Sequence, residues 1–131
     1  EGDTKIALLP RDSNVSAKKI LKDLKNLSDI DSIGVIISDT FGRPWRDGHV
    51  NFAIGCAGMS PYIDYKGTVD AVGKVLKVTT IAVADELAAA SELVTGKSLN
   101  IPVVLIRGSE FRPESLDGES LLRSKETDLF R

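Results

Sequence analysis

The apolar residues of this chain come in short runs, and this pattern limits its fold more than any other feature. Three runs, at residues 4–9, 33–37 and 101–106, are bounded by turn residues and are too short for stable helices. The run at 33–37 is also rich in β-branched residues. None approaches the roughly 20 apolar residues of a membrane helix. We therefore expect buried strands and no membrane segment.

Two longer segments have helical patterns instead. Apolar residues recur every third or fourth position over 16–27, with lysines between them, which predicts an amphipathic surface helix. An alanine-rich segment predicts a second helix, capped by Thr79 or Thr80, running to about Thr95 and ended by Gly96. One more helical turn is expected over 119–123.

The glycine-rich stretch between Phe41 and Gly73 separates these segments and predicts short strands and functional loops. No repeat or low-complexity tract interrupts the chain. Strands and helices should therefore share one core, in an α+β fold with a mixed sheet and a few helices. We expect residues 1–131 to form a single domain, although the order of the strands is not readable from the sequence.

The composition excludes several kinds of site. One cysteine and one histidine allow neither an internal disulfide nor a zinc site of the His/Cys kind, so acid, base and metal chemistry must fall on carboxylates. The lone cysteine fits a reducing cytoplasm. Charge is nearly balanced, with 17 Lys and Arg against 19 Asp and Glu, and no basic arm for nucleic acid is present.

The first candidate site follows the predicted strand at 33–37. Asp39 comes directly after this buried run, where α/β proteins commonly place ligand-binding groups, and Thr40 adds a hydroxyl beside it. Oxygen donors of this kind suit Mg²⁺ or Mn²⁺. The alternative interpretation is an ordinary turn at a strand end.

The loop after Thr40 carries Arg43 and Arg46 between Gly42 and Gly48. Guanidinium groups at this spacing are able to clamp phosphates or carboxylates. In the alternative interpretation the arginines pair with local acids while Trp45 anchors the loop in the core.

Other carboxylates are weaker candidates. Asp64 and Asp70 flank a turn, where most such residues are simply solvated. Asp85 and Glu86 interrupt the alanine-rich helix and need a partner, a metal or an exposed face, of which exposure is the commonest.

The triplet Gly96, Lys97 and Ser98 is not a Walker phosphate loop, because the earlier glycine is absent and the triplet follows a helix. Cys56 has its only histidine, His49, in what we expect to be the same extended segment. We therefore interpret Cys56 as a buried structural thiol.

The residues themselves resemble the F420-0:gamma-glutamyl ligase family over nearly the whole chain. The resemblance is carried by segments 36–46 (IISDTFGRPWR), 53–59 (AIGCAGM), 64–67 (DYKG), 82–90 (AVADELAAA), 103–108 (VVLIRG) and 128–131 (DLFR).

This resemblance implies an enzyme that uses GTP to join L-glutamate to coenzyme F420-0 and that works as a homodimer. It implies Mg²⁺ or Mn²⁺, with K⁺ as a further cation. It assigns metal ligation to Asp39 and Thr40, and nucleotide contacts to the Gly96, Lys97 and Ser98 segment. Arg43 and Arg46 are then expected to stabilise oxyanions in catalysis.

Two positions depart from the family pattern, since Lys97 replaces an expected glutamine and Asp47 replaces a common asparagine. The resemblance also places this chain in the carboxy-terminal half of the ligase module, with the amino-terminal half absent. We therefore expect a catalytic fragment that is inactive alone. The alternatives are a non-catalytic metal or nucleotide-binding module and a structural dimerisation domain.

Overall fold

The computed structural model describes residues 8–113, 120–128 and 130. These ranges contain α1 (Ser13–Leu27), β1 (Val35–Arg43), β2 (Arg46–Ala57), β3 (Ile63–Asp64), β4 (Thr80–Ile81) and α2 (Val83–Thr95). Strand β1 pairs with β2 and β3 pairs with β4, both antiparallel. The α+β class is confirmed, but antiparallel pairs stand in place of the expected mixed sheet among the described strands. Neither α1 nor α2 has the length and apolar content to cross a membrane.

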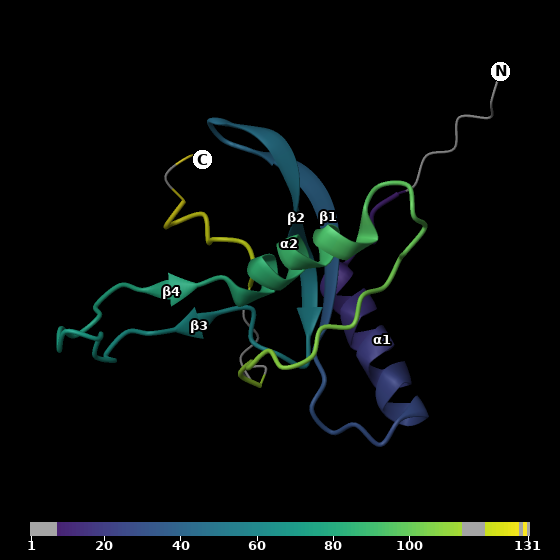
Figure 1. Ribbon diagram of the computed structural model, residues 1–131, viewed down its shortest axis with the longest axis horizontal. Coiled ribbons are helices and arrows are strands. Elements are labelled where there is room, and N and C mark those ends of the chain that lie inside the picture. Colours follow the sequence, from purple (N-terminus) through teal and green to yellow (C-terminus); the bar gives the residue numbers. More distant parts are fainter. Residues whose placement is uncertain (1–7, 114–119, 129, 131) are drawn as a thin grey trace.

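The β1–β2 hairpin is the centre of the structure, and the helices pack against its two faces (Figure 1). On one face Val35 and Ala57 pack around Ala17 of α1. On the other, Cys56 packs with Met59 and with Val83 of α2. Residues that alternate along a strand point to opposite faces. The predicted strand at 33–37 is confirmed from Val35 onward, and Cys56 is buried as predicted.

The ends of the two helices show which capping residues set the helix boundaries. Helix α1 begins after Asp12, whose Oδ1 accepts a hydrogen bond from the Val15 backbone N–H at 2.9 Å. The predicted caps of α2 are wrong, because Thr80 lies in β4 and the N-cap is Ala82, which makes no side-chain bond. Gly96 does end α2, with φ of 54°, as expected.

The expected strand at 101–106 is wrong, because none of its residues lies in a strand. A strand needs a neighbour for its backbone donors and acceptors, and the described residues supply none there. Val103 and Leu105 are 79% and 67% exposed. No helical turn forms over 120–123, and the run at 4–9 lies mainly outside the described residues.

The β3–β4 pair forms the base of an arm that projects from the rest of the molecule (Figure 1). Asp70 organises its far turn, because its Oδ1 accepts the backbone N–H groups of Val72 at 3.0 Å and Lys74 at 2.8 Å. This carboxylate therefore has a structural role of the kind that aspartates often take in turns.

Gly55 lets α1 approach β2 closely. A Cβ built on Gly55 would lie 2.5 Å from the backbone C and O atoms of Ser13. We expect Gly55→Ala to lower the free energy of unfolding by about 2 kcal/mol, because backbone must move to admit the methyl group. Gly42→Ala is the control, since a Cβ there meets nothing within 4 Å. Equal urea denaturation midpoints for the two variants would contradict this account.

Candidate functional site

Thr40 lies at the centre of a polar cluster formed by three elements. Its Oγ1 donates to Oδ1 of Asn51, its register partner on β2, at 2.6 Å. The Lys97 Nζ, from the segment just after α2, donates to Thr40 Oγ1 at 2.8 Å. It also forms an ion pair with Glu92 Oε1 of α2 at 2.6 Å. The structure thus brings together Thr40 and Lys97, which sequence reasoning had singled out separately.

Sequence reasoning missed two members of this cluster, Asn51 and Glu92. Asn51 becomes visible only through the strand register, which places it opposite Thr40. The Glu92 side chain is 25% exposed, and its Oε2 is buried without a hydrogen-bond partner among the described residues. Burial of that one oxygen costs solvation, and the positive charge of Lys97 offsets part of this cost.

Asp39 lies on the opposite face of β1 from Thr40, because adjacent strand residues alternate. Its register partner is Phe52, whose ring stacks on Phe41 with centroids 4.5 Å apart. The half-buried Asp39 carboxylate makes no hydrogen bond or ion pair with the described residues. Asp39 and Thr40 therefore do not converge on one point in this structure.

The two candidate arginines lie at the tip of the β1–β2 hairpin, where they are register partners. Arg43 Nη2 donates to the Asp47 backbone carbonyl at 2.9 Å, whereas its Nε is buried and unpaired among the described residues. Arg46 is exposed. Trp45 has φ of 56° and is 91% exposed, so the interpretation that it anchors the loop in the core is wrong.

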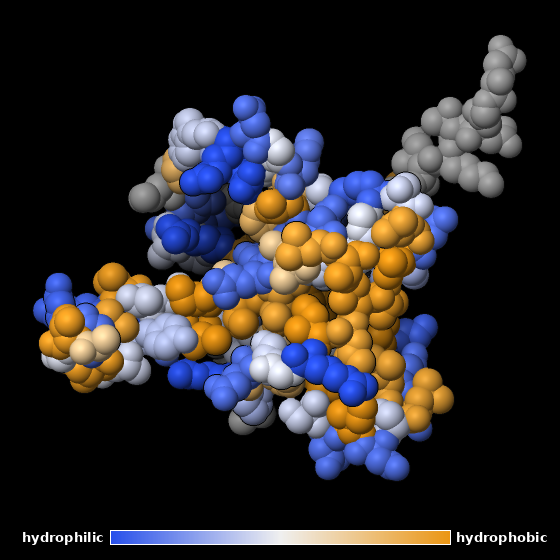
Figure 2. Space-filling view, viewed as in Figure 1, coloured by the Kyte–Doolittle hydropathy of each residue, from blue (hydrophilic) through white to orange (hydrophobic). Residues whose placement is uncertain are grey.

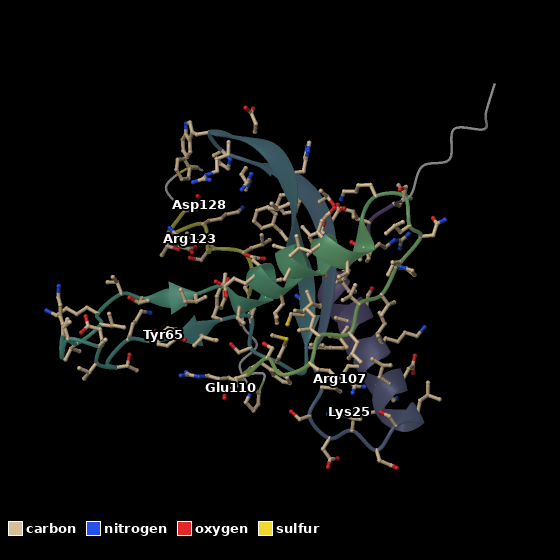
Figure 3. The ribbon with its side chains drawn as sticks, in the orientation of Figure 1. Lys25, Tyr65, Arg107, Glu110, Arg123 and Asp128 are labelled. Carbon is tan, nitrogen blue, oxygen red and sulfur yellow. The ribbon has the colours of Figure 1, made fainter. Side chains whose placement is uncertain are left out.

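An open pocket of about 430 Å³ adjoins the polar cluster and is lined by Gly96, Lys97, Asn100, Ile101 and Pro102. Lys97 thus faces both Thr40 and this pocket. Ser98 is exposed and does not line it. A smaller pocket of about 270 Å³ lies near the base of the arm, between Tyr65 and Glu110 (Figure 3).

Asp85 and Asp64 have structural partners, whereas Glu86 is exposed, as expected. Asp85 Oδ1 accepts the Ala53 backbone N–H at 2.9 Å and so ties the first turn of α2 to β2. The backbone N–H of Lys66, which donates to Asp64 at 2.9 Å, is the main cause that holds the pKa of Asp64 below its ordinary value of 3.8. Asp64 therefore stays ionised at neutral pH and anchors its turn, whereas a general base needs a raised pKa.

The fit to a divalent cation differs between the two predicted ligands. The described residues contain no group of three or more His, Cys, Asp or Glu side chains that would hold a metal alone. Mg²⁺ in nucleotide sites commonly takes only one or two carboxylates, with phosphate oxygens and waters as its other ligands. The unpaired carboxylate of Asp39 fits that requirement, whereas the hydroxyl of Thr40 is already engaged by Asn51 and Lys97.

Comparison with known proteins agrees with the resemblance in the sequence. Residues 1–108 match the family described as F420-0:Gamma-glutamyl ligase. The chain is 48% identical over 126 residues to the coenzyme F420:L-glutamate ligase of Methanothermobacter thermautotrophicus, covering 94% of this chain and 50% of that protein. For the protein of the same name from Methanocaldococcus jannaschii, the identity is 44% over 127 residues, covering 96% and 51%. The chain therefore spans about half the length of these curated relatives.

Proposed function

We propose, because the chain belongs to the F420-0:gamma-glutamyl ligase family, that it forms part of the catalytic body of an enzyme that joins L-glutamate to coenzyme F420-0. The observation that carries this proposal is the agreement with the Methanothermobacter ligase, at 48% identity across 94% of this chain. We place the enzyme in the cytoplasm, since a single cysteine in this chain fits a reducing compartment.

The proposal includes GTP as the second substrate, with Mg²⁺ or Mn²⁺ and K⁺ as cations. Joining an acid to an amine at the expense of GTP places several negative charges close together. A divalent cation, when bound, supplies positive charge that offsets this repulsion. Asp39 would hold that cation, because its carboxylate is half-buried and has no partner among the described residues.

The arginines and the lysine would act on oxyanions. Arg43 suits this role best, because among the described residues only its Nη2 has a partner, the Asp47 carbonyl, so the half-buried guanidinium keeps a donor for a phosphate or carboxylate oxygen. Arg46, opposite it across the hairpin, adds a second, exposed guanidinium. Lys97 lines the pocket next to Gly96 and supplies a point charge toward it.

Complementation tests this function. We expect the chain alone to ligate little or no glutamate, because much of the site would come from the half of the module that it does not span. Adding the amino-terminal half of the Methanothermobacter ligase should restore ligation, detected as glutamylated F420 by mass spectrometry. That half alone is the control.

Two outcomes would contradict the proposal. Strong ligation by the chain alone would refute the claim that its site is partial. A stable complex of the two halves that forms no glutamylated product would refute the ligase function itself.

An association domain is a second candidate, favoured by the apolar surface after α2. The segment following α2 exposes Leu99, Val103 and Leu105 at 63%, 79% and 67%. Figure 2 shows hydrophobic residues gathered on this face of the molecule. Surfaces of this kind mark protein contacts, and the proposed homodimer would cover them. Self-association in sedimentation experiments without any GTP binding would favour this candidate over the ligase fragment.

A further inference from the structure

The ammonium group of Lys97 lies where oxygen atoms from β1 and α2 converge. It is 2.8 Å from the Thr40 hydroxyl and 2.6 Å from Glu92 Oε1. The Thr40 hydroxyl is in turn bonded to the amide oxygen of Asn51 at 2.6 Å. Hydroxyl, carboxylate and amide oxygens are the ligands that hard cations take in proteins. The surroundings of this ammonium therefore have the chemistry of a cation site.

The charge of Glu92 explains why a cation belongs there. One of its oxygens is buried without a hydrogen bond, and the other is paired with Lys97. Burial of one carboxylate oxygen costs part of its solvation, and a positive neighbour offsets that cost. Lys97 reaches this position from the segment after α2 while its side chain stays 65% exposed.

We infer that the Lys97 ammonium occupies a cation position formed by Thr40 and Glu92, with Asn51 holding the Thr40 hydroxyl, and that it excludes metal ions from Thr40 in this chain. Glu92 then positions Lys97 directly, and Asn51 acts through the Thr40 hydroxyl. Asp39, on the other face of β1, holds its cation without Thr40. The identity of that second cation rests on the proposed function, whereas the geometry around Lys97 does not.

Paramagnetic broadening by Mn²⁺ alone tests this inference, with the Asn51 side-chain amide as the reporter in ¹⁵N-labelled protein. Every protein in this experiment carries Asp39→Asn, because Mn²⁺ bound at Asp39 would lie close enough to broaden the Asn51 signal by itself. In this background the Asn51 signal should withstand Mn²⁺ as long as Lys97 is present. In Lys97→Gln the Mn²⁺ concentration that halves this signal should fall about tenfold or more, because a positive charge within about 4 Å of the ion is removed. Because the Lys97 side chain is exposed, its substitution should leave the fold intact and the other amide signals unchanged. A general change in the amide spectrum would therefore reveal a folding defect.

Two further variants sharpen the result. Lys66→Gln removes the same charge from another ion pair, the exposed Lys66–Asp64 contact of 3.5 Å, and should leave the Asn51 response unchanged. When Glu92→Gln is added to Lys97→Gln, the Asn51 signal should again withstand Mn²⁺, because the carboxylate ligand is gone.

Equal Mn²⁺ sensitivity of Asn51 in the Asp39→Asn chain with and without Lys97→Gln would overturn the inference. A gain that survives Glu92→Gln would overturn it as well. The measurement contains no GTP, glutamate or F420-0, so a failure here leaves the ligase function standing. A failure of ligation likewise leaves this inference standing.

Discussion

Asp39→Asn is expected to lower kcat/KM for glutamate ligation by about 100-fold or more when the chain is combined with the amino-terminal half of the Methanothermobacter ligase. The substitution keeps the size of the side chain and removes its charge. Asp39 has no hydrogen bond or ion pair with the described residues to lose, so the fold should be retained. The missing charge weakens cation binding and leaves the repulsion between phosphate and carboxylate groups uncompensated.

Asp47→Asn is the matched control for this experiment. It makes the same chemical change on the same hairpin, but Asp47 contacts Arg43 through its backbone carbonyl, which the substitution keeps. We expect activity within about threefold of the unmodified pair, since an exposed charge of this kind contributes little. Similar losses for Asp39→Asn and Asp47→Asn would remove Asp39 from the site.

Arg43→Lys is expected to lower the same kcat/KM by about 10- to 100-fold, although the positive charge is kept. A lysine has neither the planar fork of a guanidinium nor a donor at the position of Nε, the atom that is buried and unpaired in the structure. The contact from Nη2 to the Asp47 carbonyl would also be lost. The steady-state rate of product formation at varied GTP concentration measures this effect.

Arg11→Lys is the control for Arg43→Lys, because Arg11 is exposed just before α1, away from the hairpin tip. We expect no more than about a twofold change from it. An Arg43→Lys variant with full activity would show that charge alone is required at the hairpin tip, or that Arg43 contacts no substrate.

Local sequence signals correctly predicted the elements that depend on nearby residues. They failed for segments whose structure depends on pairing with residues far away in the sequence. The period of apolar residues located α1, and Gly96 located the end of α2. Thr80 failed as a cap because pairing with Asp64 of β3 places it in a strand. The run at 101–106 has the composition of a strand, but composition does not supply the neighbouring strand that its backbone requires.

In the candidate site, too, contacts between distant residues were harder to predict than the properties of neighbouring ones. Asp39 and Thr40 are neighbours in sequence, and this adjacency suggested shared ligation, yet strand geometry directs their side chains to opposite faces. Thr40 and Lys97 are 57 positions apart and lie in hydrogen-bond contact. Asn51 and Glu92 carried no signal in the sequence, because their roles depend on strand register and on the packing of α2 against the hairpin.

Isothermal titration of GTP with Mn²⁺ into this chain and into Asp39→Asn tests the central claim most directly, because it requires no complete active centre. If the chain carries part of a nucleotide and metal site, the unmodified protein binds GTP and Asp39→Asn loses that binding. No binding by either protein, or equal binding by both, would contradict the account.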